Sequence, residues 1–504
     1  MQNSLKRLVP DGFIPYSGEQ KILNRHKIEP ILSKNVHKLV DSMSAVFDLL
    51  QIKDGFTFSF HHHLRNGDAV MNLVLAEIKK RNLKDISLAP SAIFPIHEPL
   101  VELINLGLIK DIYTNYINGP VADAIQEGKL KGMLYMDSHG GRPRAIETGE
   151  LIIDVAFIAV PASDSYGNGN GVEGKSACGT LGYAISDLLY AKHKVVITDF
   201  IIEKPIIIDI DGNYVDYVVK VDHIGDPEGI VSGTTKPTKD PIQLKIAKDT
   251  VKLIEELGLI KDEMSFQTGA GGTSLAVALE LKKRMVLNHI KGSFASGGIT
   301  SFLVDMHEQG LFERLYDVQC FDLVAVKSYL KNKNHFKMSA SEYGNPNEVN
   351  PIVNQLDVVI LGATEIDLDF NVNVTTDSNG KIIGGSGGHS DTAQGAKITI
   401  ITTNLMKSRT SIVKKEVTTI TTPGSSVDVL VTERGIAINP LRKDLIEILV
   451  NSKLNITTIN NLYELSHDII GYPQEQKSSK KVIGVVRYRD GSIIDSLYAK
   501  KEVE

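Results

Sequence analysis

Two glycine-rich segments in the second half of the chain could bind a negatively charged group. Ser265–Ser274 reads SFQTGAGGTS and directly precedes a helical apolar pattern, whereas Gly384–Asp391 reads GGSGGHSD. Glycine allows a ligand to approach the backbone closely, and a helix N-terminus behind such a loop adds free N–H groups and partial positive charge. We expect these loops to suit a carboxylate, a phosphate or an oxyanion. The alternative is a pair of tight turns that bind nothing.

A second group of candidate residues is cationic and lies in the first half. Three histidines at 61–63 are followed by Arg65, and Arg142 and Arg144 lie in the segment GGRPRA. Adjacent residues of an extended segment point to opposite faces, so three neighbouring histidines cannot readily ligate one ion, and we expect no metal site. Contact with an anionic substrate is the better interpretation. For the two later arginines a solvated turn stays open as the alternative.

Other patterns with a chemical meaning are weak or missing in the sequence. Gly169, Gly171 and Gly174 form a GxGxxG string, but no clear helix begins at the third glycine, so we expect no dinucleotide there. There is no Walker A sequence and no G-x-S-x-G elbow of a serine hydrolase. The two cysteines, Cys178 and Cys320, have no CxxC neighbour, which argues against a zinc site or a disulfide framework and favours a reducing compartment.

The bulk composition is that of an ordinary globular protein with more than one domain. The chain has 504 residues, 42% of them hydrophobic, and a net charge of -6. This length suits two or three domains, and the mild charge makes nucleic acid a poor candidate partner. No apolar run reaches about 18 residues, and the N-terminus has no signal-peptide pattern, so we expect a cytoplasmic protein without a membrane span.

The elements that must position the candidate residues are duplicated at a spacing of 203 residues. Leu73–Asn82 reads LVLAEIKKRN and Ala276–Met285 reads AVALELKKRM, with five identities in ten positions. The same spacing recurs at further positions, among them Asp154 facing Asp357, Asn168 and Asn170 facing Asn371 and Asn373, and Lys194 facing Lys397. A spacing this long indicates two copies of a whole domain rather than a short solenoid repeat.

Each copy alternates apolar β-rich runs with helical patterns, which predicts an α/β fold with a mostly parallel sheet covered by helices. We expect an N-terminal extension at residues 1–40, a first domain at 41–231 and a second domain at 242–504 that ends in a helical tail. Leu441–Val450 is amphipathic within that tail. The segment Gly229–Pro241, GIVSGTTKPTKDP, predicts the linker between the domains.

The two copies differ where the glycine-rich loops occur. With a local three-residue gap, the first loop corresponds to SFHHHLRNGD in the first copy, and the second loop corresponds to the helix-like LGYAISDL. At these two junctions, glycine is therefore enriched only in the second copy. We expect one cleft between two unequal domains, with the glycine loops on one side and the histidines on the other.

These residues together resemble a known family. The chain is similar to the alpha subunit of citrate lyase, within the CoA-transferase superfamily, over segments that span nearly its whole length: Phe56–Asp68, Gly140–Arg144, Asp154–Asn168, Phe266–Val277, Gly292–Ile299, Gly384–Ala396 and Thr432–Ala437. The resemblance implies two tandem CoA-transferase-type domains. It also implies transfer of a carrier thioester from acetate to citrate.

The partners and cofactors follow from the same resemblance. It implies an acyl carrier protein with a CoA-like prosthetic group, replaceable by CoA thioesters, and a separate lyase (beta) subunit within an oligomer. No tightly bound cofactor and no metal are implied. In the expected mechanism citrate attacks the acyl thioester directly, and backbone amides stabilise each oxyanion.

We assign site residues on this basis. The expected catalytic residues are Gly269, Gly271, Gly272 and Glu342. The expected substrate contacts are His61, His62, Arg65, Asn66, Arg142, Ser293, Ser296, Gly297, Gly298 and Arg434. The residues expected to hold the CoA-like group are Gly385, Gly387, Gly388 and His389.

Two alternatives stay open. Ser341–Gly344 reads SEYG and resembles the Ser-Glu-x-Gly motif of acid CoA-transferases, in which the glutamate forms an enzyme-bound thioester. Glu342 would then be a nucleophile. The other alternative is a non-catalytic ligand-binding or scaffold protein, because this fold also serves such functions.

Overall fold

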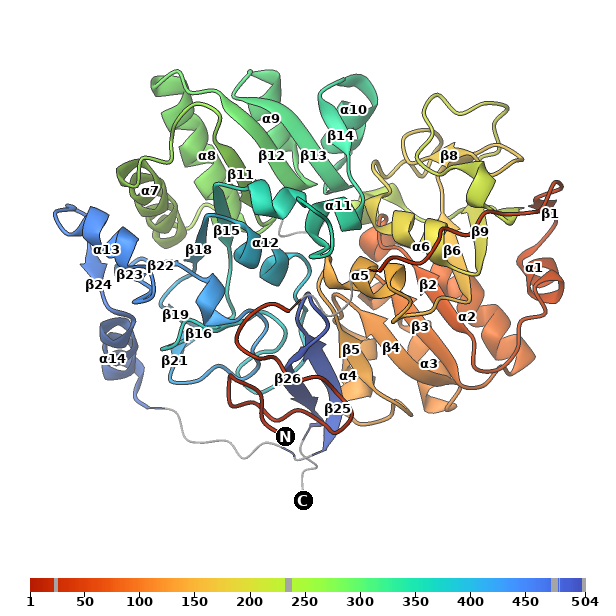
Figure 1. The fold of residues 1–504 in the computed structure, drawn as a ribbon, viewed down its shortest axis with the longest axis horizontal. Helices are drawn as coiled ribbons and strands as arrows, with labels where there is room; N and C mark the ends of the chain where they lie inside the picture. Colours follow the sequence, from red (N-terminus) through yellow and green to blue (C-terminus); the bar gives the residue numbers. More distant parts are fainter. Residues whose placement is uncertain (22–25, 232–237, 473–478, 480, 501–504) are drawn as a thin grey trace.

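Two open sheets covered by helices form the framework (Figure 1). Most of the first half of the chain builds one sheet, and most of the second half builds the other. The structure is a computed structural model and describes residues 1–21, 26–231, 238–472, 479 and 481–500. The strands of the first sheet lie in the order β1 (Leu39–Val40), β10 (Tyr217–Lys220), β9 (His193–Thr198), β6 (Val155–Ala159), β2 (Thr57–Phe60), β3 (Ile86–Pro90), β4 (Ile109–Thr114), β5 (Leu134–Met136), β25 (Val482–Arg487) and β26 (Ile493–Tyr498).

The second sheet repeats the central part of this order. Its strands are β14 (His335–Lys337), β13 (Phe312–Cys320), β12 (Gly292–Ile299), β11 (Ser265–Thr268), β15 (Val358–Leu361), β18 (Ile398–Thr402), β22 (Val429–Thr432), β23 (Gly435–Ile438) and β24 (Ile456–Thr457). The run from β5 through β2 to β10 matches the run from β14 through β11 to β22. Each run is parallel throughout. The predicted α/β class, with two related domains, is confirmed.

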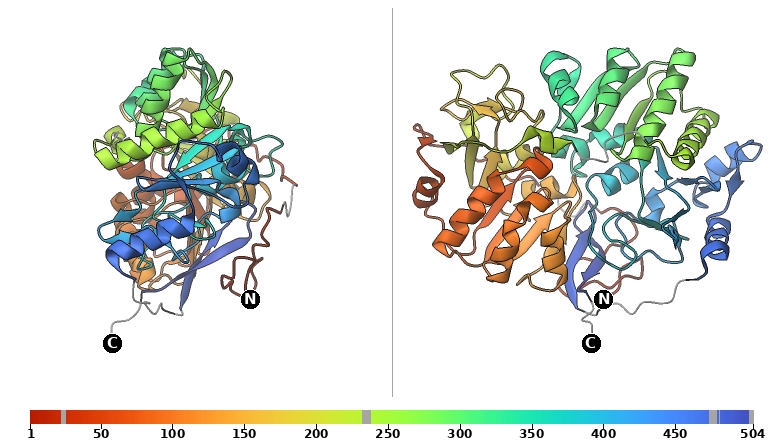
Figure 2. Two further views of the ribbon diagram at one scale, coloured as in Figure 1. Left: turned by 90° about the vertical axis from the view of Figure 1, so that its left-hand side faces the viewer. Right: turned by 180° about the vertical axis from the view of Figure 1, so that it is seen from behind.

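Helices cover both sheets (Figures 1 and 2). In the first domain these are α1 (Met43–Leu49), α2 (Val70–Arg81), α3 (Pro99–Asn105), α4 (Pro120–Gln126), α5 (Gly141–Glu147) and α6 (Ile185–Tyr190). The second domain has α7 (Pro241–Glu256), α8 (Gly272–Leu287), α9 (Ser301–Glu308), α10 (Leu323–Lys331), α11 (Ala340–Gly344), α12 (His389–Gly395), α13 (Lys443–Leu449) and α14 (Ile459–Ile470). Helix α7 shows why such segments are helical: Asp240 caps its N-terminus, proline follows, and a buried apolar stripe faces the sheet.

Short hairpins and bridges complete the fold outside the two sheets. These are β7 (Ala162–Ser163) with β8 (Gly169–Asn170), β16 (Glu365–Asp367) with β17 (Val372–Asn373) and β21 (Val413–Lys414), and β19 (Met406–Lys407) with β20 (Thr410–Ser411). Residues 232–237 of the predicted linker lie outside the described residues. In the part of the chain that is described, no helix combines the length and apolarity needed to cross a membrane.

The polar residues shared by the two copies hold equivalent turns. Asp154 accepts a hydrogen bond from the amide of Thr57 (2.8 Å), and Asp357 accepts one from the amide of Ser265 (2.9 Å). The second oxygen of each carboxylate accepts from a lysine. That lysine is Lys397 in the second domain but Lys192 in the first. The predicted pairing of Lys397 with Lys194 is therefore wrong, because the spacing of equivalent residues has grown by two before the last strands.

The last two strands of the chain return to the first sheet. Strand β25 pairs in parallel with β5 and antiparallel with β26, so the hairpin extends the edge of the first domain. The predicted second domain, 242–504, includes these residues. The 203-residue duplication could not predict their place in the first sheet, because β25 and β26 have no counterpart in the other copy. Apolar residues on both faces of β25 are buried, as expected for a strand that lies between two others, here β5 and β26.

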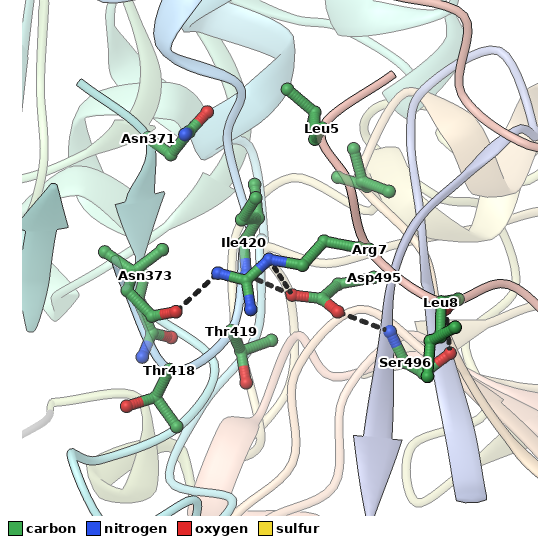
Figure 3. A network of polar contacts seen from close by, with 12 residues as sticks. Leu5, Arg7, Leu8, Asn371, Asn373, Thr418, Thr419, Ile420, Asp495 and Ser496 are labelled. Carbon is green, nitrogen blue, oxygen red and sulfur yellow. Dashed lines mark hydrogen bonds and ion pairs between the residues drawn. The ribbon is translucent and has the colours of Figure 1, made fainter. Parts of the chain in front are cut away.

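The N-terminal extension closes over this hairpin (Figure 3). Arg7 donates to the carbonyl of Val417 (2.5 Å), and its Nε lies 3.6 Å from the buried carboxylate of Asp495 on β26. Asp495 also accepts from the amide of Ile420 (2.8 Å), while Ser496 donates to the carbonyl of Leu8 (2.7 Å). The extension, the hairpin and a segment of the second domain are thus joined at one point.

Candidate functional site

The carboxyl ends of the two sheets face each other across the domain junction. Gln319, near the end of β13, donates to the carbonyl of His62, which follows β2 (2.9 Å). The amide of Gly387 donates to the carbonyl of Asn115 (3.1 Å), and the amide of His139 donates to the carbonyl of Gly387 (2.8 Å). Loops at the carboxyl edge of parallel strands are the usual place for ligands in such folds. The structure therefore brings together the histidine run and the second glycine loop.

His62, His63 and His139 form a buried, neutral wall. The ring of His62 stacks on Tyr183 at 4.4 Å between centroids, and its Nδ1 lies 2.5 Å from the hydroxyl of Ser91. The ring of His139 lies 4.6 Å from Tyr183 and 5.8 Å from the ring of His62, so the three rings form one cluster. Burial lowers the pKa of His62 and His63 well below the ordinary value, and lowers the pKa of His139 to about 3. These imidazoles can donate or accept hydrogen bonds without carrying charge at neutral pH.

Arg65 supplies a cation beside this wall. Its guanidinium lies over the ring of Phe94 from the same domain (5.7 Å) and over the ring of Phe321 from the other domain (4.9 Å). Among the described residues, no carboxylate pairs with it, and its Nη1 is buried without a hydrogen-bond partner. Burial lowers the pKa of this guanidinium. Arg65 is half-buried, and a cation that is partly removed from water without a counter-charge is costly, so the arrangement is suited to a bound anion.

Arg142, predicted to contact substrate, instead forms a buried ion pair. Both terminal nitrogens bind the carboxylate of Asp187 (2.7 and 2.8 Å), and one also donates to the carbonyl of Ala89 (2.7 Å). The same carboxylate lies 3.1 Å from Nε2 of His61. Arg142 and His61 hold the pKa of Asp187 well below its ordinary value despite burial. Arg142 and Asp187 therefore hold His61, the first residue of the histidine run, in place. Arg144 likewise pairs with Glu150 (2.7 Å).

The first glycine loop ends at the N-terminus of α8. Gly272 is the first helical residue, and Gly271 precedes it without a side-chain cap. Within the described chain the amides of these two glycines have no acceptor, as expected for the first turn of a helix. The amide of Gly269, however, donates to the carbonyl of Ile360 (3.1 Å). Two of the three predicted oxyanion donors are therefore available, and Gly269 is not.

The second glycine loop is packed rather than open. A side chain at Gly388 would collide with the hydroxyl of Tyr343, and one at Gly385 with the carbonyl of Asn115. Both ring nitrogens of His389 are occupied, Nδ1 by Thr422 (2.7 Å) and Nε2 by the carbonyl of Gly362 (2.9 Å). Burial lowers the pKa of His389 to about 4. Gly385 lets the backbone of the two domains approach closely, whereas Gly388 makes room for Tyr343 within the second domain.

The candidates on β12 divide between the two ends of the strand. Ser293 donates to the carbonyl of Glu263 (2.9 Å) near the start of the strand, away from the carboxyl edge. Ser296 donates to Gln267 (3.0 Å) within the buried core of the junction. Gly297 has a φ of 105°, and the ring of Phe321 occupies the space that a side chain at Gly298 would need.

Three other predicted residues lie at the surface. Glu342 is exposed, and its carboxylate accepts from the amide (2.7 Å) and hydroxyl (2.9 Å) of Ser339, forming a capping box at the start of α11. Arg434 is exposed in the turn between β22 and β23, beside Glu433. Asn66 is also exposed and accepts from the amide of Ile96 (3.1 Å).

Sequence reasoning missed several residues of the junction. Asp391 accepts from Ser138 (2.8 Å) and from the amide of Gly140 (2.9 Å) in the other domain. Burial raises the pKa of Asp391 to about 6, against the influence of Arg489. Tyr183, Phe321 and Asp187 were missed as well. Asp391, Tyr183 and Asp187 lie within the compared segments, which was their one sequence signal. Phe321 had no such signal, since contacts across domains leave no periodic pattern.

Neither of two surface cavities borders the histidines or Arg65. One of about 360 Å³ is lined by Gln20, Pro346, Asn354, Gln394, Gly395 and Arg489. Another of about 610 Å³ follows α7 and α8 and is lined by Thr238, Leu244, Ala276, Leu279, Glu280, Lys282, Lys283, Val286 and Leu287. Among the described residues, no three His, Cys, Asp or Glu side chains gather in a way that could hold a metal ion.

Comparison with known proteins places this geometry in a family. The family model described as citrate lyase, alpha subunit, matches residues 36–500. The citrate lyase alpha chain of Klebsiella pneumoniae is 43% identical over 489 residues, covering 97% of this chain and 96% of the relative. That of Escherichia coli K12 is 44% identical over 452 residues, covering 90% and 89%.

Solved structures agree. A crystal structure of the alpha subunit of citrate lyase from Streptococcus mutans, in complex with citrate, has a TM-score of 0.96 and 43% identity over 99% of this chain and 100% of that one. A Pseudomonas malonate decarboxylase shares the fold at a TM-score of 0.64 and 15% identity, over 87% and 88% of the two chains. The chain belongs to the citrate lyase alpha subunit family.

Proposed function

We propose that this chain catalyses exchange of the acid on an acyl thioester: an acetyl thioester and citrate give a citryl thioester and acetate. The observation that carries the proposal for this site is Arg65. Arg65 is half-buried at the facing carboxyl edges of both sheets, its guanidinium lies against two aromatic rings, its Nη1 is fully buried, and no described carboxylate neutralises it. Citrate is a polyanion, and a partly desolvated arginine is well suited to pair with one of its carboxylates.

In the proposed first step a citrate carboxylate oxygen attacks the acetyl carbonyl. The C–S bond breaks, the thiolate leaves, and a mixed anhydride of citrate and acetate results. In the second step the thiolate attacks the citryl carbonyl of the anhydride. A C–S bond forms, the C–O bond to the acetyl group breaks, and acetate departs. Neither step requires an external acid or a covalent bond to the enzyme.

Each step develops negative charge on a carbonyl oxygen. The amides of Gly271 and Gly272, at the N-terminus of α8, have no acceptor among the described residues and are our candidates for stabilising it. Such donors contribute about 3 kcal/mol each when the oxyanion lies within hydrogen-bonding distance. Holding the two reactants together supplies a further part of the acceleration. The neutral imidazoles of His62 and His139 add uncharged hydrogen-bonding groups beside Arg65.

We further propose that the acyl group arrives on CoA or on the CoA-like group of a small acyl carrier protein, and that a separate beta subunit cleaves the citryl thioester. The exposed position of Gly271 supports an approach of the thioester from the α8 side. The buried second glycine loop leaves less room for a pantetheine chain than sequence analysis expected.

A panel of acids tests the proposed function. Purified protein is incubated with acetyl-CoA and citrate, acetate, succinate or hydroxybutyrate, and acyl-CoA products are separated by chromatography. We expect citryl-CoA to form fastest. Arg65→Met should raise the KM for citrate by more than tenfold, whereas Arg434→Met, which alters an exposed arginine beside Glu433, should not. No preference for citrate would overturn the substrate assignment.

A further inference from the structure

Phe321, a residue of the second domain, contacts the guanidinium of Arg65 in the first domain. It directly follows β13, and its amide donates to the carbonyl of Ile299 at the end of β12 (2.8 Å). Its half-buried ring covers the guanidinium of Arg65 at 4.9 Å. Among the hydrogen bonds, ion pairs and cation–π contacts of the described residues, this ring is the partner that the second domain offers to the Arg65 guanidinium.

The backbone beneath the ring is shaped to receive it. The pairing of β12 with β13 shifts register between Gly297 and Gly298, and Gly297 adopts a φ of 105°. A Cβ at Gly298 would overlap the ring of Phe321 itself. Gly298 thus leaves the space that the ring occupies. Its role is steric.

The backbone of Arg65 is held from the other side. Arg65 adopts a φ of 52°, unusual for a residue with a side chain, and its amide donates to the carbonyl of His62 (2.9 Å). The following Gly67 is packed so closely on Asp226 and Gly229 that a side chain there would collide with their backbone. The backbone is therefore fixed by the first domain, and only the long side chain is left to be oriented.

We propose that Phe321 is a positioning residue for citrate recognition, which acts by holding the Arg65 guanidinium in the orientation that pairs with a citrate carboxylate, and that Gly298 is required for this placement. The inference rests on the proposed function. An aromatic face attracts a cation and restricts it to one plane, and the effect grows when water is excluded. Since the ring comes from the second domain, the cation is correctly placed only when both domains are in register.

Steady-state kinetics with acetyl-CoA and citrate test the proposal in the full-length chain. Phe321→Leu keeps apolar bulk but removes the aromatic face. We expect it to raise the KM for citrate about tenfold, with less than a twofold change in the KM for acetyl-CoA. Phe321→Tyr keeps an aromatic face and should leave the KM for citrate unchanged. Phe336→Leu is the matched control, because Phe336 stacks on Tyr316 (5.8 Å) at the edge strand β14; it should leave both constants unchanged.

A double variant separates positioning from general loosening. If Phe321 acts through Arg65, Phe321→Leu combined with Arg65→Met should resemble Arg65→Met alone, because the ring has no cation left to hold. Multiplicative effects on the KM for citrate would overturn the inference, as would an unchanged KM in Phe321→Leu. Gly298→Ala, which displaces the ring from beneath, gives an independent route to the same loss if Phe321→Leu folds poorly. An unchanged KM for citrate in Arg65→Met would instead overturn the proposed function of that arginine.

Discussion

The carboxylate of Asp391 in the second domain accepts a hydrogen bond from the amide of Gly140 in the first, with the two atoms 2.9 Å apart. A side chain at Gly140 would collide with the backbone of Gly344, so the domains meet here without intervening side chains. The contact is buried, and Arg489 donates to the carbonyl of Gly344 beside it (2.6 Å). An ionisable group thus lies where the backbone of one domain packs directly on that of the other.

This contact predicts a pH dependence of stability. The pKa of Asp391 is raised from 3.8 to about 6, so the folded state binds this proton more tightly than the unfolded state. The resulting stabilisation is fully present below about pH 4 and is lost as pH rises through 6, a change on the order of 3 kcal/mol. Asp391→Asn should remove this part of the slope in urea unfolding measured between pH 4 and 7. Equal slopes in both proteins would contradict it.

Glu342 should be dispensable for the chemistry. Its carboxylate caps α11, and glutamine can replace glutamate in a capping box, so Glu342→Gln should keep the rate of citryl-CoA formation within about twofold. Glu342→Ala should lower the free energy of unfolding by about 1 kcal/mol. Mass spectrometry after incubation with acetyl-CoA and hydroxylamine should find no modified Glu342. A hydroxamate at this position, with inactive Glu342→Gln, would establish the glutamyl-thioester mechanism instead.

Arg142 should be important mainly for stability. Arg142→Met would leave Asp187 buried with His61 as its remaining ion-pair partner among the described residues, and loss of one partner from a buried ion pair costs about 3–5 kcal/mol. Chemical denaturation of the purified variant measures this loss. Arg144→Met is the comparison, because Arg144 pairs with the partly exposed Glu150 and should cost less. Equal, small losses in both variants would show that the Asp187 pair is not a structural support.

The first glycine loop can be tested with a methyl group. Gly271 has an ordinary φ of -73°, and no atom lies within 4 Å of the position that a Cβ would take, so Gly271→Ala should fold normally. If a thioester binds against this loop, the methyl group should raise the KM for acetyl-CoA at least tenfold. Gly362→Ala is the control, since Gly362 has equally open space after the neighbouring strand β15. Identical kinetics in the two variants would place the thioester elsewhere.

The sequence was most informative where it was duplicated. Asp154 and Asp357 were matched by spacing alone, and the structure shows both holding the start of a central strand. Contacts between the copies were not predictable in this way. Phe321 and Arg65 are 256 residues apart with no counterpart pair, and Arg142 looked free because its partner Asp187 lies in a segment that resembles an ordinary helix. Cross-domain contacts depend on how two sheets dock, which local patterns do not encode.

The return of β25 and β26 to the first sheet has a consequence for biosynthesis. When the ribosome has made the first half of the chain, the edge of β5 still lacks its neighbour, and the N-terminal arm lacks the hairpin on which it rests. The sheet of the nascent first domain therefore stays incomplete, with the edge of β5 unpaired, until the second domain has been synthesised. A nonsense mutation near residue 480 would remove no glycine loop and no histidine, yet it would release a chain whose unprotected edge favours aggregation.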